Sequence, residues 1–314
     1  MPKIAFIFPG QGSQYVGMGK DFAEHHPAAA AVFAQAEQQL GFSLAKLCFE
    51  GPEDVLKQTS NTQPALLTTS IACYEVLKGE GIQPDYLAGH SLGEYSALVA
   101  AGSISFPDAV SLVQKRGQLM EEAYPSGQGG MAAVLGLSAL QVEKVCKAAT
   151  SYGLVQPANY NCPGQVVIAG ENAALKQAVI LAKEAGAKRV VELAVSGPFH
   201  SKLMEKAGDK LAAILSEIEV RDPFLPVIAN VNAEPLRTGQ EVRNSLVKQL
   251  SNPVRWEETV QKLYDLGVRI FVEVGPEKVL SGLVKKIVKD VLIANVQDRE
   301  SLQKTLTALK GGNC

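Results

Sequence analysis

The feature that most constrains the fold is a G-x-S-x-G pattern at residues 89–93, because it lies between a short apolar segment and a helical pattern. Residues 86–89 are predicted to form a strand, and residues 92–99 carry apolar side chains at helical spacing. Small residues on both sides of Ser91 allow a sharp bend without Cβ clashes. A strand, a tight turn and a helix in this order indicate a nucleophile elbow, with Ser91 exposed at the carboxyl end of a strand.

The rest of the chain agrees with an α/β sheet covered by helices, because strand-like runs alternate with amphipathic helical patterns. Strands are expected at residues 4–8, 271–274 and 291–296. Helices are expected over residues 28–40 and 64–78.

A separate small unit is predicted in the middle of the chain. Its strands are expected at residues 131–137, 154–161, 165–169 and 189–194, and its helices after Ser138 and over 173–185. The order β-α-β-β-α-β is that of a ferredoxin-like unit. We therefore expect a small ferredoxin-like domain at residues 126–197, inserted into a large α/β domain formed by residues 1–125 and 198–314.

The composition excludes several functional classes. Of the 314 residues, 46% are hydrophobic and 20% are charged, with a net charge of -2, which is typical of a globular enzyme. Lys and Arg are scattered, so no nucleic-acid partner is expected. No apolar run approaches the roughly 18 residues that span a bilayer, so no membrane partner is expected either. The cysteines are odd in number and lack a C-x-x-C pair, which indicates reduced thiols in a cytoplasmic protein; they are Cys48, Cys73, Cys146, Cys162 and Cys314.

A nucleophilic serine needs a base, and the chain has four histidines. His25 and His26 lie among polar residues and are expected at the surface. His90 adjoins Ser91, but neighbouring side chains at a sharp turn diverge. His200 follows a turn after the small unit, so we predict that it is the base. The alternative is that Ser91 caps a helix and His200 is a structural residue.

A third member of a catalytic triad is not evident. Glu192 lies between the serine and the histidine in chain order, but it sits within a strand pattern. A main-chain carbonyl could also orient the imidazole by accepting its Nδ1 proton. The residues alone leave both possibilities open.

An arginine interrupts the apolar stripe of the helix expected after Ser105. Arg116 falls among Ala109, Leu112, Val113, Leu119 and Met120. A buried guanidinium is costly unless an anion meets it, because it does not lose its charge. That anion could be a protein carboxylate, in a structural ion pair, or the carboxylate of a substrate. A side chain that reaches past the core to solvent is a further alternative.

Several motifs in register resemble one family. They are residues 9–14, 89–95, 116–117, 161–165 and 197–200, with sequences PGQGSQ, GHSLGEY, RG, NCPGQ and GPFH. Over nearly the whole chain they closely resemble the malonyl-CoA:acyl carrier protein transacylases of fatty acid synthesis. The resemblance implies an α/β-hydrolase-like large domain with a ferredoxin-like small domain. It also implies malonyl transfer from malonyl-CoA to acyl carrier protein, with coenzyme A thioester as a substrate and no cofactor or metal.

The resemblance also implies roles for individual residues. Ser91 matches the acylated nucleophile and His200 its base. Gln249 matches the residue whose main-chain carbonyl orients that histidine. Gln11 and Leu92 match the positions whose amides form the oxyanion hole.

Two further positions match substrate contacts of the family. Arg116 matches the arginine that holds the malonyl carboxylate, and Phe199 is similar to malonyl-selective members. Cys162 departs from the serine that is common there. A serine thioesterase, a silent relative that docks carrier proteins and a trans-acting polyketide acyltransferase remain alternatives. The chain has no H-G-G-G-type segment, which argues against the thioesterase.

Overall fold

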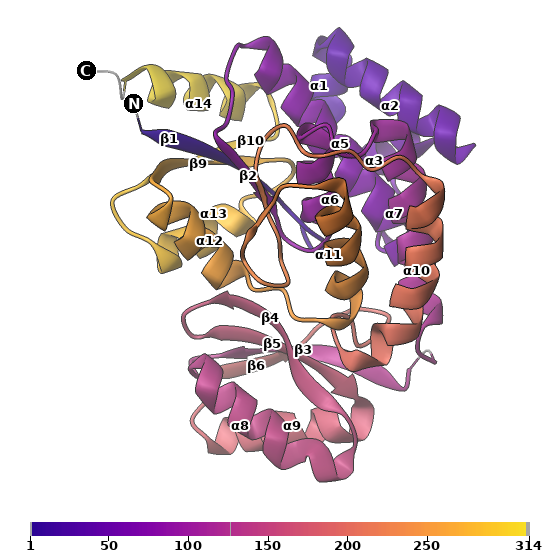
Figure 1. Cartoon of the computed structure of the whole chain (residues 1–314), viewed down its shortest axis with the longest axis vertical. Helices are drawn as coiled ribbons and strands as arrows, with labels where there is room; N and C mark the ends of the chain where they lie inside the picture. Colours follow the sequence, from indigo (N-terminus) through magenta and orange to yellow (C-terminus); the bar gives the residue numbers. More distant parts are fainter. Residues whose placement is uncertain (1, 126, 312–314) are drawn as a thin grey trace.

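The computed structural model describes residues 2–125 and 127–311, so Cys314 and residue 126, where the small domain is expected to begin, lie outside it. These residues form two sheets packed into one body (Figure 1). The strands of the larger sheet are β1 (Lys3–Phe8), β2 (Tyr86–Gly89), β7 (Val227–Ile228), β8 (Pro235–Leu236), β9 (Val268–Val274) and β10 (Leu292–Val296). They are ordered β10-β9-β1-β2-β7-β8, and all neighbours are parallel except β7 and β8.

The central strand β1 shows why this sheet has helices on both faces. Phe6 and Phe8 point into one apolar core, whereas Ala5 and Ile7 point into the other. Successive side chains of a strand alternate between the two faces, so a strand that is apolar throughout must be covered on both sides.

Helices from along most of the chain contribute buried side chains to the first core. They are α1 (Lys20–His25), α2 (Pro27–Leu40), α3 (Leu44–Glu50), α4 (Glu53–Leu56), α5 (Thr59–Gly79), α6 (Leu92–Ala100), α7 (Phe106–Glu122), α10 (Glu205–Glu217), α11 (Gly239–Ser251) and α14 (Arg299–Gly311). The second core is built with α12 (Trp256–Asp265) and α13 (Val279–Ile287). Within the described residues, no helix combines the length and apolar character that crossing a bilayer requires.

The smaller sheet has the strand and helix order expected from the sequence. Its elements are β3 (Gly129–Leu135), α8 (Ala139–Ala149), β4 (Val155–Cys162), β5 (Gln165–Glu171), α9 (Asn172–Glu184) and β6 (Arg189–Glu192). The strands are ordered β4-β5-β3-β6 and all neighbours are antiparallel. Both helices cover the face turned away from the larger sheet (Figure 1). Ser138 and Gln141 form a capping box at the start of α8, as the sequence predicts.

The smaller sheet is attached to the rest of the chain along the outer edge of β4. The Tyr160 N–H donates to the Val254 carbonyl at 2.9 Å, and the Val254 N–H donates to the Ala158 carbonyl at 2.9 Å. Strand-type pairing therefore ties the smaller sheet to the segment that leads into α12.

Helix α5 begins at Thr59, five residues before the start at Pro64 that the sequence pattern predicts. Contacts with α7 hold the additional turn. The Thr59 N–H donates to Glu121 Oε1 at 2.7 Å. Gly117 lets the two helices approach closely, because a Cβ there would lie 2.7 Å from the Ser60 Cα. The early start matters because the additional turn carries Gln63, which contacts Arg116 of α7.

Candidate active site

The turn between β2 and α6 holds Ser91 in a strained conformation, with φ 51° and ψ -106°. The two glycines of the pattern make this bend possible. A Cβ on Gly89 would lie 1.9 Å from the main chain of Gly93, and a Cβ on Gly93 would lie 2.0 Å from the Phe8 carbonyl oxygen. Any larger residue would force β1, β2 and α6 apart, so the pattern is required by the packing of these three elements.

Ser91 and His200 lie within hydrogen-bond distance, although they are 109 residues apart in sequence. Ser91 Oγ is 2.8 Å from His200 Nε2. On the other side of the ring, Nδ1 is 2.8 Å from the main-chain oxygen of Gln249. Glu192, the acid that the sequence left open as an alternative, is exposed on β6. The contact to the carbonyl fixes the ring so that Nδ1 donates and Nε2 is free to accept the serine proton.

The environment of His200 keeps its ring neutral. Its side chain is buried, and this burial, together with the positive charge of Arg116, lowers the pKa of His200 to about 3. A neutral imidazole that faces a serine hydroxyl has the protonation state that a general base requires.

Arg116 is 1% exposed, and its described partners are uncharged. Nη1 donates to Gln63 Oε1 at 2.8 Å, and Nη2 donates to Gln249 Oε1 at 2.9 Å. Nη2 also lies 3.3 Å from Ser91 Oγ. No ion pair links Arg116 to a carboxylate within the residues that the structure describes. The buried charge thus lies beside the candidate nucleophile and can accept an external anion.

Gln11 lies in the loop after β1, which packs against the elbow. A Cβ on Gly10 would lie 2.4 Å from the His90 carbonyl oxygen. The Gln11 side chain donates to Thr59 Oγ1 at 3.2 Å. Among the described residues, the main-chain amides of Gln11 and Leu92 donate to no protein acceptor. Leu92 directly follows Ser91, and unpaired main-chain amides are the type of group that stabilises an oxyanion.

Phe199 directly precedes His200 and is 4% exposed. Its ring belongs to the first apolar core and lies against Gly197, where a Cβ would be 3.2 Å from the ring. The structure therefore places this residue beside the site, with its ring packed inward.

Three residues for which no role was predicted from the sequence lie around the site residues and contact them. Gln63 binds Arg116, as described above. Asn230 accepts the Ser91 N–H at 2.7 Å and donates to the Gly89 carbonyl at 2.7 Å, so it spans the elbow. Glu94 is fully buried in the first turn of α6. A charged residue among small and apolar neighbours is a sequence feature that could have pointed to Glu94, whereas no local feature distinguishes Gln63 or Asn230.

His90 contacts the smaller sheet and does not face Ser91 Oγ. Its Nε2 lies 2.8 Å from Asn161 Oδ1, and its ring packs 5.7 Å from the ring of Trp256. Burial lowers the pKa of His90. This contact joins the elbow to β4, so the two sheets meet beside the candidate nucleophile.

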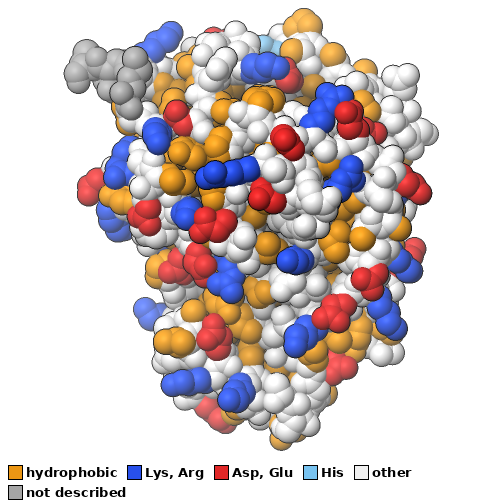
Figure 2. Space-filling model, viewed as in Figure 1, with side chains coloured by type: hydrophobic (Ala, Val, Ile, Leu, Met, Phe, Trp, Pro, Cys, Tyr) orange, Lys and Arg blue, Asp and Glu red, His pale blue; other side chains and the backbone are white. Residues whose placement is uncertain are grey.

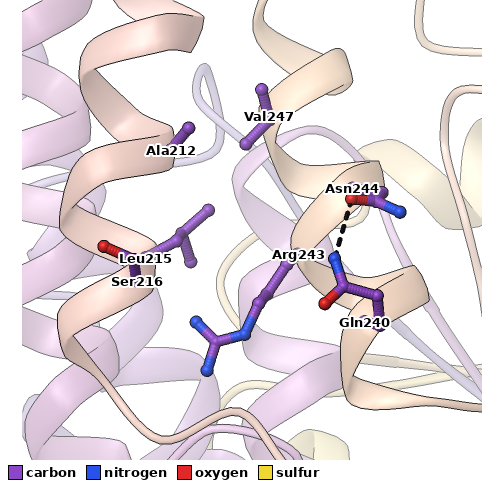
Figure 3. Close-up of a pocket in the computed structure, with 7 residues that line it drawn as sticks. All are labelled: Ala212, Leu215, Ser216, Gln240, Arg243, Asn244 and Val247. Carbon is purple, nitrogen blue, oxygen red and sulfur yellow. Dashed lines mark hydrogen bonds between the residues drawn. The ribbon is translucent and has the colours of Figure 1, made fainter.

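A hollow of about 400 Å³ lies between α10 and α11 and contains none of these site residues (Figure 3). It is lined by Ala212, Leu215, Ser216, Gln240, Arg243, Asn244 and Val247. Arg243 extends into the space between the helices and donates to the Ile218 carbonyl at 2.8 Å. On the face shown in Figure 2, basic and acidic side chains are interspersed.

Comparison with known proteins identifies the family. Residues 5–307 match the acyl transferase domain family. The chain is 51% identical to the malonyl CoA-acyl carrier protein transacylase of Bacillus subtilis over 314 residues, which is 100% of this chain and 99% of that protein.

Two solved structures share its mixed α/β fold. An acyl carrier protein S-malonyltransferase from Vibrio cholerae has a TM-score of 0.94 and 47% identity, covering 96% of this chain and 99% of that chain. A malonyl-transacylase in complex with its type II PKS acyl-carrier protein has a TM-score of 0.95 and 46% identity, covering 98% and 99%. The chain therefore belongs to the malonyl CoA-acyl carrier protein transacylase family of acyl transferase domains.

Proposed function

We propose that this protein transfers the malonyl group of malonyl-CoA to the phosphopantetheine thiol of acyl carrier protein, through an ester on Ser91, for fatty acid synthesis. The observation that carries the proposal is the 2.8 Å contact of Ser91 Oγ with His200 Nε2 beside the buried Arg116. Family membership supports the same reaction.

In the first half-reaction, His200 accepts the Ser91 proton while Oγ attacks the malonyl thioester carbon. The main-chain carbonyl of Gln249 holds the imidazole and stabilises its charge. The amides of Gln11 and Leu92 donate to the tetrahedral oxyanion. The carbon–sulfur bond then breaks, and coenzyme A leaves with the proton from the imidazole.

In the second half-reaction, the phosphopantetheine thiol of the carrier protein takes the place of coenzyme A. His200 accepts the thiol proton, the sulfur attacks the malonyl ester, and Ser91 leaves with that proton. The enzyme thus alternates between a free and a malonylated serine, which is a ping-pong mechanism.

Arg116 supplies selectivity for an acyl group that ends in a carboxylate. A planar guanidinium can hold a carboxylate through two parallel hydrogen bonds, and burial strengthens them. Phe199 directly precedes the base His200, and we assign its side chain to the wall of the malonyl pocket.

We also assign the six-stranded unit, residues 1–125 and 198–314, to an α/β-hydrolase-like large domain. Its elbow at the carboxyl end of β2 supports this assignment. We assign residues 126–197 to a ferredoxin-like small domain, on the basis of its β-α-β-β-α-β order. The cytoplasmic location expected from the sequence stays a prediction.

A polyketide carrier protein is a second candidate acceptor. The observation that favours it is the similar transacylase that was solved with its type II PKS acyl-carrier protein. Parallel transfer assays with a fatty acid carrier and a polyketide carrier distinguish the two, because the natural acceptor should give the larger kcat/KM.

Intact-mass measurement after mixing with malonyl-CoA tests the proposal. We expect the wild type to gain one malonyl group and Ser91→Ala to gain none. A wild type without the added mass would contradict the proposal. Release of free malonate in place of transfer to the carrier would indicate a thioesterase.

A further inference from the structure

Among the described residues, Arg116 has no carboxylate at hydrogen-bond distance, yet the carboxylate of Glu94 lies on the far side of the Gln249 side chain that Arg116 contacts. Glu94 is 0% exposed and accepts three hydrogen bonds. The donors are Gln249 Nε2 at 2.8 Å, the Asn230 N–H at 3.0 Å and the Ser245 hydroxyl at 3.1 Å. Three donors satisfy a buried carboxylate that has no contact with solvent.

The side chain of Gln249 links Glu94 to Arg116. Its Nε2 donates to Glu94 Oε2 at 2.8 Å and to the Ser91 carbonyl at 3.0 Å, while its Oε1 accepts from Arg116 Nη2 at 2.9 Å. Turning this amide over would place its oxygen against two acceptors and its NH₂ against the guanidinium. Glu94 therefore fixes which end of Gln249 faces Arg116.

The intervening amide also leaves Arg116 available. A direct ion pair with Glu94 would occupy the face of the guanidinium that a second carboxylate needs. The neutral Oε1 of Gln249 holds the guanidinium in place, and the charged carboxylate of Glu94 does not touch the guanidinium. Burial raises the pKa of Glu94, whereas its hydrogen bonds and the charge of Arg116 act in the opposite direction.

We propose that Glu94 is a positioning residue for selection of the malonyl group: it fixes the Gln249 carboxamide, which holds the Arg116 guanidinium where the substrate carboxylate binds. The inference rests on the proposed function. It assigns a role to the side chain of Gln249, in addition to its main-chain carbonyl.

Two substitutions at position 94 distinguish the effect of side-chain length from the effect of charge. Glu94→Asp keeps the charge but withdraws the carboxylate from Gln249. Glu94→Gln removes the charge but keeps the reach, because its oxygen can accept from Gln249 and Asn230 while its NH₂ donates to the Ser245 hydroxyl. Ser245→Ala is the matched control, since it removes a bond to Glu94 on the side away from Gln249.

The rate of malonylation of Ser91 by malonyl-CoA, followed by intact mass, is compared with the rate of Ser91 labelling by an uncharged fluorophosphonate. The second reaction needs an activated serine but no carboxylate site. For Glu94→Asp we expect malonylation to fall about tenfold or more relative to labelling, the size expected when a charged hydrogen bond is lost. Glu94→Gln and Ser245→Ala should keep both rates within about threefold of the wild type.

A double-mutant cycle with Gln249→Met tests whether Glu94 acts through that side chain. Met keeps the main-chain carbonyl and similar bulk, so the double variant Glu94→Asp/Gln249→Met should be no slower than Gln249→Met. Equal losses in malonylation and labelling, additive losses in the cycle, or a tenfold selective loss in Glu94→Gln would overturn the inference. If Glu94→Asp does not fold, Gln249→Met decides: it should lose malonylation selectively relative to labelling, and equal losses in the two reactions would overturn the inference. A wild type that is labelled by the fluorophosphonate but not malonylated would instead contradict the proposed function.

Discussion

Ser91 is held at each of its polar atoms by a different part of the chain. Its N–H donates to Asn230, and its carbonyl accepts from Gln249. Its Oγ lies between His200 and Arg116. A positive φ in a non-glycine residue persists when the surroundings fix it, and here those surroundings also supply the chemistry.

The role of Arg116 in selectivity leads to a test with two acyl donors. Arg116→Ala should reduce kcat/KM for malonyl transfer by about a hundredfold or more, since it leaves the substrate carboxylate buried without a partner. Acetyl transfer, measured in the same assay with acetyl-CoA, should change far less because acetyl carries no charge. Equal reductions for both donors would remove Arg116 from the selectivity mechanism.

The low pKa of His200 predicts an unusual pH profile. Because burial and Arg116 lower this pKa to about 3, the ring stays neutral, and thus able to accept a proton, at pH values well below its ordinary pKa of 6.5. The rate of coenzyme A release in the first half-reaction should therefore stay nearly flat from about pH 8 to about pH 5. A one-proton decline centred near about pH 6.5 would show that the imidazole titrates normally.

Individual site residues differ in how well the sequence predicts them. Ser91 could be found from its flanking glycines, and His200 because few histidines compete with it. Arg116 stands out in an apolar stripe. Asn230 and Gln63 are ordinary polar residues until the fold brings them to the elbow and to the guanidinium, so no local pattern could have selected them.

The elbow depends on close contact between β1, β2 and α6. Gly93→Ala would place a methyl group 2.0 Å from the Phe8 carbonyl oxygen. We expect a loss of about 3 kcal/mol or more in the free energy of unfolding, because main-chain atoms must move. In α13, a Cβ on Gly282 would meet nothing within 4 Å, so Gly282→Ala is the control. It should be neutral or stabilise the protein by up to about 1 kcal/mol. Denaturant unfolding measures both, and similar stabilities for the two variants would refute this account of the turn.

Helix α13 is capped by a buried acid from β9. Glu273 accepts the Leu280 N–H at 2.9 Å and the Ser281 N–H at 2.7 Å, and burial raises the pKa of Glu273 to about 7. The folded pKa lies above the unfolded one, so the contribution to stability is complete below about pH 4.5 and is lost as the pH rises through about 7.

Thermal unfolding at about pH 5 and about pH 8 tests this linkage. Glu273→Gln cannot ionise, so its melting temperature should fall less between the two pH values than that of the wild type, by on the order of 2 °C or more. Glu192→Gln, a change at an exposed acid on β6, should follow the wild type. If both variants show the wild-type pH dependence, Glu273 does not titrate in this range.

Helix boundaries show where sequence patterns stop being sufficient. The start of α8 follows from its capping box, which is a local signal. The start of α5 does not, because its first turn is held by Glu121 and by the close approach of Gly117. Both contacts come from α7, more than one helix later in the chain.

The whole molecule places its candidate active site where the two sheets meet. Ser91 follows β2 of the larger sheet, whereas His200 lies on the segment that returns from β6 of the smaller one. The sequence predicts the strands of the smaller unit with their order along the chain, and four strands of the larger sheet, but it misses the two-residue strands β7 and β8. It does not predict that β1 lies between β2 and β9, because β1 and β9 come from opposite ends of the chain.

The proposed reaction requires that one serine carry the malonyl group between two thiols. The most direct test isolates the malonylated protein free of coenzyme A and mixes it with carrier protein that bears phosphopantetheine. We predict that the malonyl mass leaves Ser91 and appears on the carrier, and that His200→Ala slows this step by roughly 10²- to 10⁴-fold. A malonylated protein that is stable in the presence of the carrier, or that releases free malonate, would contradict the account.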